Sequence, residues 1–207
     1  MEMVESAPDV VETVMRWNER CPVAPHSTYG VAKAAVDYYC QTAWRERNTP
    51  VISLRQFNCV GERETHPYVV PEIISQIHQN NGVGMYHEVK LGNNSFRDFQ
   101  YAGDAVRMAV ELLEKGGFGE VYNMGSEGGT RIYDLAKTVG KLMGKDVMAM
   151  EDQSRKRPWE IWHLQSDNGK LYDIIDSRPN VSFEEALKRT INYFNESGHE
   201  WIWEETA

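Results

Sequence analysis

The 207-residue sequence is 41% hydrophobic and 26% charged, which is ordinary globular usage and excludes wholesale disorder and collagen-like repeats. Its 31 acidic and 22 basic residues give a net charge of −9, and a surface this acidic argues against nucleic acid as the main partner. No run approaches the length of about 18 apolar residues that a membrane-spanning helix needs, so no membrane partner is expected.

Apolar side chains in the first third of the chain predict two helices and a strand. Residues 8–18 carry valines and a methionine at helical spacing, and small or apolar residues recur at helical spacing over 29–47. The run at 50–57 is apolar and rich in β-branched residues, which predicts a buried strand.

Strands and helices continue to alternate along the rest of the chain. We expect a helix starting near residue 71, extended segments at 89–91 and 96–101, a helix over 102–115, strands at 119–125 and 145–150 with a helix over 132–142 between them, and a helix over 183–194. Thr130 is placed to cap the helix over 132–142, and Ser182 with Glu185 forms a capping box before the last helix. This alternation predicts an α/β fold with a largely parallel sheet.

The cysteines and histidines show no metal-binding or disulfide spacing. Cys21, Cys40 and Cys59 form no CxxC pair, which is typical of reduced thiols in a cytoplasmic protein. The histidines form no HxH or HxxxH pair, so no metal site is expected. The acidic N-terminus does not resemble a secretory signal, and a cytoplasmic location is therefore expected.

A tyrosine and a lysine four residues apart form the first candidate for chemistry. On a helix, Tyr29 and Lys33 would share one face about a turn apart. A phenol is a poor base at pH 7 until a nearby cation favours its anion, and Lys33 is placed to supply that cation. The pentapeptide alone favours an ordinary surface pair, because YxxxK occurs easily by chance.

The order of the motifs after this pair is more specific than any one of them. In chain order they are Tyr29-x-x-x-Lys33, Arg55-Gln56-Phe57-Asn58 with Gly61, Leu91-Gly92-Asn93, Arg97-Asp98-Phe99 with Tyr101 and Asp104, Tyr122-Asn123 with Gly125, Arg157-Pro158, and Asp167-Asn168 with Lys170. The series resembles the extended short-chain dehydrogenase/reductase family, which includes the NAD-dependent nucleotide-sugar epimerases and 4,6-dehydratases. The resemblance covers roughly 19–195, and the segment 88–170 is most similar to the bacterial 4,6-dehydratases.

The resemblance implies roles for particular residues. Tyr29 would be the acid/base that removes or returns a sugar hydroxyl proton, with NAD or NADP as the cofactor, and Lys33 would hold the nicotinamide ribose. Asn58, Arg97 and Arg157 would approach the diphosphate of a nucleotide-sugar, a task for which the planar, always charged guanidinium is suited. The structural alternatives are a turn residue at 58 and a local salt bridge between residues 97 and 98.

The resemblance also implies a domain organisation. A partial Rossmann-like parallel sheet is expected in residues 1–65, which would hold the helical insertion at 8–18, the YxxxK helix and the strand at 50–57. Residues 66–207 would mainly form a smaller C-terminal α/β subdomain that binds the sugar-nucleotide, with 96–125 returning to the Rossmann sheet.

One part of the family pattern is absent from the sequence. No GxxGxxG or GxGxxG motif follows an opening strand, so the turn that binds a cofactor's pyrophosphate is missing. The chain therefore resembles a C-terminal portion, and its strand at 50–57 would have an unpaired edge. A separate N-terminal Rossmann chain is an expected partner. A homo-oligomer through the YxxxK helix is also expected, with Ala34, Tyr38 and Thr42 on faces able to meet a second copy.

Two functional hypotheses follow. The first is the catalytic and nucleotide-sugar-binding portion of an NAD(P)-dependent epimerase or 4,6-dehydratase, which is inactive until a Rossmann half completes it. The alternative is a catalytically silent nucleotide-sugar-binding or assembly protein that has kept the fold. The sequence leaves open the nucleotide, the sugar, the choice between NAD and NADP, and the choice between epimerase and dehydratase.

Overall fold

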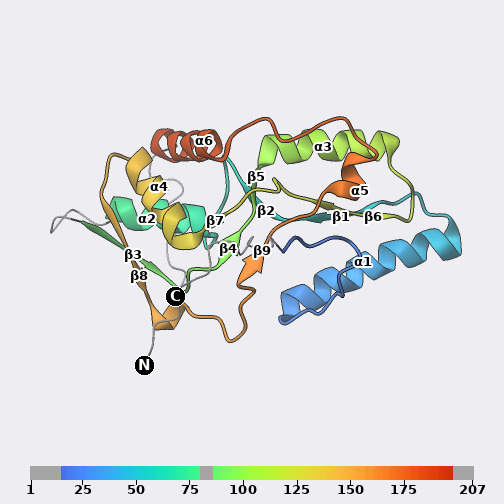
Figure 1. Cartoon of the computed structure of the whole chain (residues 1–207), viewed down its shortest axis with the longest axis horizontal. Coiled ribbons are helices and arrows are strands. Elements are labelled where there is room, and N and C mark those ends of the chain that lie inside the picture. Colours follow the sequence, from blue (N-terminus) through green and yellow to red (C-terminus); the bar gives the residue numbers. More distant parts are fainter. Residues whose placement is uncertain (1–14, 80–85, 198–207) are drawn as a thin grey trace, which may run out of the picture.

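The computed structural model describes residues 15–79 and 86–197 (Figure 1). Its helices are α1 (Thr28–Arg47), α2 (Val69–Gln79), α3 (Ala102–Lys115), α4 (Ile132–Leu142), α5 (Gly169–Tyr172) and α6 (Phe183–Glu196), with a 3-10 turn at Gln153–Arg155. Its strands are β1 (Ser53–Gln56), β2 (Asn58–Val60), β3 (His87–Leu91), β4 (Phe96–Arg97), β5 (Phe99–Tyr101), β6 (Val121–Met124), β7 (Thr130–Arg131), β8 (Val147–Glu151) and β9 (His163–Leu164).

The strands pair mostly in parallel, which confirms the predicted α/β class. Strand β1 pairs with β6, β2 with β5, β3 with β8, and β4 with β9, all in parallel, and only the short β7 joins β4 in the antiparallel sense. The predicted strand at 50–57 is observed as β1, and the chain changes neighbour at Phe57, so that the following β2 pairs with β5. Figure 1 shows α3 on one side of β1 and β6 and α1 on the other.

Two apolar clusters form the core. One packs α3 against β6 and the segment around α5, with Met108, Leu112 and Met124 at its centre. The other packs α2, α4 and α6 over β2, β3 and β5, and includes Ile73 and Leu135. Each amphipathic helix thus buries one stripe of side chains, as its periodicity predicts.

The helix α1 is anchored at both ends but is little covered between them. At its start, the Ser27 hydroxyl accepts a hydrogen bond from the Gly30 amide at 3.0 Å. At its end, Trp44 packs on Phe118 and against Gly119, whose φ of +78° and lack of a Cβ allow that approach. Only two of its 20 residues are buried.

Two local predictions are wrong. Residues 8–14 of the predicted helix at 8–18 lie outside the described residues, but 15–18 are not helical. The Trp17 backbone instead bonds to Gln165 and Asp167, and its indole nitrogen donates to the His163 carbonyl at 3.0 Å.

None of the helices in 15–79 and 86–197 is long and apolar enough to cross a membrane.

The second error concerns the start of α4. Thr130 does not cap this helix, because it lies in β7 opposite Arg97. The backbone amides in the first turn of α4, which have no partner within the helix, bond to a loop distant in sequence. The Asn94 side-chain oxygen accepts from the Tyr133 amide at 2.9 Å, and the Ser95 carbonyl accepts from the Ile132 amide.

Candidate functional site

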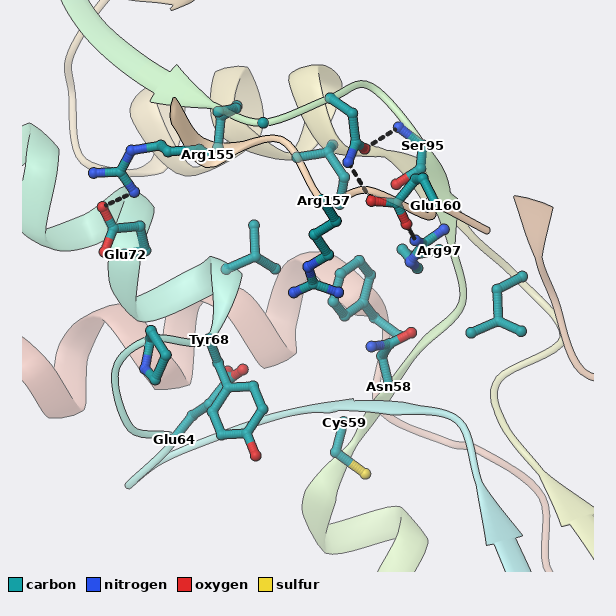
Figure 2. A pocket seen from close by; sticks show the side chains of 18 of the residues that line it. Asn58, Cys59, Glu64, Tyr68, Glu72, Ser95, Arg97, Arg155, Arg157 and Glu160 are labelled. Carbon is teal, nitrogen blue, oxygen red and sulfur yellow. Dashed lines mark hydrogen bonds and ion pairs between the residues drawn. The ribbon is translucent and has the colours of Figure 1, made fainter. Parts of the chain in front are cut away.

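A cavity of about 670 Å³ opens at the C-terminal ends of β1 and β3 (Figure 2), where parallel α/β sheets commonly bind ligands. Its walls come from the start of α1, from β2, from the loop at 61–68 and α2, from the loop between β3 and β4, and from the segment 155–160. Segments far apart in the sequence therefore converge on one space.

Four of the five residues predicted to act at a site line this cavity. They are Tyr29, Asn58, Arg97 and Arg157. Lys33 does not line it, but its Nζ lies 5.5 Å from the centroid of the Tyr29 ring. The Tyr29 ring is 69% exposed in the first turn of α1, so a bound molecule can reach its hydroxyl.

Arg97 reaches the cavity wall with its guanidinium already engaged. It forms an ion pair with Glu160 and donates to the carbonyls of Phe96 and Ile161, at 2.8 and 2.5 Å. Burial lowers the pKa of this guanidinium despite the opposing effect of Glu160. The structural alternative, a local salt bridge with Asp98, does not form: Arg97 pairs instead with Glu160, 63 residues further along the chain.

Arg157 is the cation best placed to meet a ligand. No ion pair or hydrogen bond joins its side chain to any residue in the described part of the chain. In Figure 2 its side chain extends into the space between Tyr68 and Asn58. The close approach of its segment to β3 needs Gly92, because a Cβ there would collide with the Arg155 carbonyl oxygen.

Arg155, which the sequence analysis missed, is held by α2. Its Nη1 lies 2.6 Å from Oε1 of Glu72, which also contacts His66 and accepts from Gln76 at 2.7 Å. Burial opposes ionisation of Glu72, but Gln76, Arg155 and His66 outweigh it and lower the pKa of this carboxyl. This wall of the cavity is thus a neutralised ion-pair network.

Two oxygens in the cavity lining are buried without a partner. Oδ1 of Asn58 and Oε2 of Glu64 have no hydrogen-bond partner among the described residues. Burial raises the pKa of Glu64 to about 8, and burial together with Glu64 and Asp98 raises the pKa of the Cys59 thiol to about 11. Both groups are therefore mainly protonated at pH 7.

Asp98, between the cavity-lining residues Arg97 and Phe99, is a fully buried carboxylate to which the sequence analysis gave no role at the site. It accepts hydrogen bonds from the amide and hydroxyl of Ser126, at 2.8 and 2.5 Å, and from those of Ser166, at 3.0 and 2.6 Å. The Glu127 amide adds a fifth at 3.2 Å. Asp98 thereby ties β4 and β5 to the loop after β6 and to the segment after β9.

The charges around the cavity favour an anionic ligand. Among the described lining residues, four basic side chains face three carboxyls: Lys90, Arg97, Arg155 and Arg157 against Glu64, Glu72 and Glu160. Because Glu64 is mainly neutral at pH 7, the excess of positive charge is larger than this count suggests. The described residues contain no cluster of three or more potential metal ligands.

Comparison with known proteins gives one family match. A sequence model of the GDP-mannose 4,6 dehydratase family matches residues 10–190. Human dTDP-D-glucose 4,6-dehydratase is 29% identical over 190 residues, which are 89% of this chain and 53% of the human protein. The chain spans about half the length of the curated relatives it matches.

Solved structures give the same fold. The dTDP-glucose 4,6-dehydratase of Bacillus anthracis, in complex with NAD, superposes with a TM-score of 0.77 at 23% identity, covering 91% of this chain and 58% of that one. The UDP-glucose 4-epimerase of Thermotoga maritima, with UDP-glucose, superposes with a TM-score of 0.74 at 28% identity, covering 84% and 55%.

Proposed function

Because the chain belongs to the GDP-mannose 4,6 dehydratase family, we propose that it is the catalytic and nucleotide-sugar-binding portion of an NAD(P)-dependent 4,6-dehydratase or epimerase. The observation that carries the proposal is the convergence of Tyr29, Asn58, Arg97 and Arg157 on one cavity with an excess of positive charge. A nucleotide diphosphate is the anionic part that such a cavity would hold.

Four of the predicted site residues have distinct tasks in this proposal. The unpaired guanidinium of Arg157 grips the diphosphate, whereas Arg97, paired with Glu160, shapes the wall and adds its field. Tyr29, at the exposed start of α1, takes a proton from a sugar hydroxyl and later returns it. The Lys33 ammonium, 5.5 Å from the centroid of the Tyr29 ring, supplies a positive charge beside this proton transfer.

The residues fit one end of the cofactor and not the other. When bound, NAD or NADP would supply reversible oxidation of a sugar carbon, and in this proposal Lys33, beside the Tyr29 ring, holds its nicotinamide ribose. The glycine-rich segment 125–129 follows β6, but its Ser126 and Glu127 amides already bind Asp98 and cannot cradle a pyrophosphate.

Open surfaces support a separate N-terminal Rossmann half. In the described part of the chain β1 has β6 as its only strand neighbour, so its other edge can receive a further parallel strand. On α3, Val106, Val110 and Leu113 are all more than half exposed at helical spacing. We infer that a Rossmann half adds strands at β1 and covers this stripe.

The helix α1 supports a homo-oligomer. Its exposed apolar side chains include Val36, Tyr38 and Tyr39, and Thr42 is exposed beside them. A second copy packed along this face would cover them, as expected for a helix that buries so little within its own chain.

Calorimetric titration tests the assignment of the cavity. The chain should bind UDP-glucose or dTDP-glucose more tightly than NAD or NADP, because the diphosphate cations are present and the glycine-rich turn is not. Arg157→Ala should weaken nucleotide-sugar binding about tenfold or more, the usual cost of losing a hydrogen bond to a charged group. Arg47→Ala, an exposed arginine at the far end of α1, is the control and should leave affinity unchanged. Micromolar binding of NAD with no binding of any nucleotide-sugar would refute the assignment.

Turnover by the isolated chain tests the need for a second part. We expect the 207-residue chain to show no dehydratase or epimerase activity with UDP-glucose, dTDP-glucose or GDP-mannose and added NAD or NADP. Activity should appear when a polypeptide with a glycine-rich Rossmann half is supplied. Turnover by the chain alone would contradict the proposed division of the enzyme. If no activity appeared after the Rossmann half was added, the alternative of a catalytically silent nucleotide-sugar-binding protein would be favoured.

A further inference from the structure

Glu64 is directed into the cavity by a turn in the loop after β2. Its predecessor Arg63 has a left-handed backbone with φ of 65°, which is uncommon for a residue with a side chain. The Glu64 amide bonds to the Gly61 carbonyl at 3.3 Å and closes the turn. Glu62 and Arg63 are exposed, whereas Glu64 lines the cavity. Such conformations persist where the surrounding structure holds them, often at functional sites.

The buried end of Glu64 has an unmet requirement for a partner. Its Oε2 is inaccessible and lacks a hydrogen-bond partner in the described residues, and the same holds for Oδ1 of the neighbouring lining residue Asn58. An ionised carboxylate in this position would be left without a donor, which is costly in a desolvated site. A protonated carboxyl, in contrast, brings its own donor to the cavity.

The surroundings of Glu64 do not supply an ion pair. The titratable and charged side chains that line the same cavity are Tyr29, Cys59, Tyr68, Glu72, Lys90, Arg97, Arg155, Arg157 and Glu160. Of these, Arg97 and Arg155 are paired with other carboxylates. Burial, with no compensating cation, holds the pKa of Glu64 near 8, so the acid form dominates at pH 7.

We infer that Glu64 is a specificity-determining residue that donates a hydrogen bond, as a neutral carboxylic acid, to an oxygen of the bound nucleotide-sugar, while Oδ1 of Asn58 accepts one from a sugar hydroxyl. The inference rests on the proposed function, which supplies the ligand class. In its neutral form Glu64 can lie beside a diphosphate without repelling it. Ionisation removes the donor and adds a negative charge, and both changes weaken binding.

The first experiment compares Glu64→Gln with Glu64→Ala in the full chain. Calorimetric titrations with UDP-glucose and with dTDP-glucose run from pH 6 to pH 9. The glutamine keeps a donor of the same shape, so its affinity should lie within about twofold of wild type at pH 7. The alanine variant should bind about tenfold more weakly, since one buried hydrogen bond is lost. Glu62→Gln, at an exposed position of the same loop, is the matched control and should behave as wild type.

The pH dependence separates this role from simple packing. Wild-type affinity should decline as pH rises through 8, because Glu64 then loses its proton. Glu64→Gln should lack that decline, while any titration of the other lining groups persists in both proteins and cancels in the comparison. Equal affinities of the glutamine and alanine variants, or a decline that Glu64→Gln retains, would overturn the inference.

Urea unfolding without ligand gives an independent measurement. The pKa of Glu64 is raised in the folded chain from its ordinary 4.5 to about 8, so the folded state holds the proton more tightly than the unfolded state. Wild type relative to Glu64→Gln should therefore be most stable below pH 4.5 and lose stability as pH rises to about 8. If the difference in unfolding free energy between wild type and Glu64→Gln stayed constant from pH 4.5 to pH 8, Glu64 would not be a neutral acid in the folded chain.

The outcomes distinguish the two proposals. If wild type binds neither nucleotide-sugar at any pH, the proposed function fails, whatever the unfolding curves show. If wild type binds and Glu64→Gln, Glu64→Ala and wild type share one affinity and one pH profile, the proposed function stands and the role of Glu64 fails.

Discussion

Tyr29→Phe should slow the completed enzyme by about 10²–10⁴-fold, the range over which a positioned acid or base contributes to rate. The substitution removes only the hydroxyl, and the ring is 69% exposed, so folding and nucleotide-sugar affinity should be retained. Tyr86→Phe is the control, because this tyrosine is also exposed and does not line the cavity. Full activity of Tyr29→Phe would make the tyrosine–lysine pair a surface coincidence.

Substitution of Lys33 tests the acid/base role of Tyr29 through the dependence of the rate on pH. Lys33→Met removes the cation 5.5 Å from the tyrosine ring centroid, and with it the positive charge proposed to assist proton transfer. The rate should fall and its rise with pH should move to higher pH, whereas Tyr29→Phe should lower the rate at every pH. Stability should change little, because an exposed pair contributes little to folding. If the pH–rate profile of Lys33→Met matched that of wild type, the proposed role of Lys33 in proton transfer would be excluded.

Asp98→Ala should be the most destabilising substitution at the site. Five donors converge on this fully buried carboxylate, and the substitution leaves them without an acceptor. Unsatisfied buried groups cost about 1–3 kcal/mol each, so we expect a loss of at least about 4 kcal/mol in the free energy of unfolding. That is a large fraction of the roughly 5–15 kcal/mol that holds a domain folded.

Urea unfolding followed by circular dichroism measures this loss. Asp98→Asn should also be strongly destabilised, because its amide group turns two hydrogens toward donors. Asp134→Ala, at a position with a 62% exposed side chain on α4, should stay within about 0.5 kcal/mol of wild type. An Asp98→Ala protein as stable as the Asp134→Ala protein would show that the five contacts are not needed for folding.

Elements with strong local signals could be predicted from the sequence. The helix predicted over 102–115 matches α3 at both ends. Of the predicted capping box, the Ser182 cap is present, with its Oγ 3.2 Å from the Glu185 amide, whereas the Glu185 side chain pairs with Arg189. The family resemblance drawn from the motif order is also confirmed. The domain boundary at 65–66 and the roles of the site residues stay predictions.

Features that depend on distant partners could not be predicted. The motifs indicated that residues 29, 58, 97 and 157 belong to one site, and the cavity brings them together. Which arginine is unpaired depends on Glu160, and the protonation of Glu64 depends on burial, neither of which has a local pattern. The cap of α4 from Asn94, 39 residues from its Tyr133 partner, is of the same kind.

Two ion pairs flank Arg157 in the sequence, Arg155 with Glu72 and Glu160 with Arg97, and they determine how much conformational entropy is lost when a ligand binds. Arg155 is tied to α2 and Glu160 to β4, so the backbone between them is fixed on both sides before anything enters the cavity. A ligand then restricts mainly the rotamers of one arginine, about 2 kcal/mol of conformational entropy, and no loop has to fold around it. Association should therefore be fast, with affinity differences among nucleotide-sugars appearing in their dissociation rates.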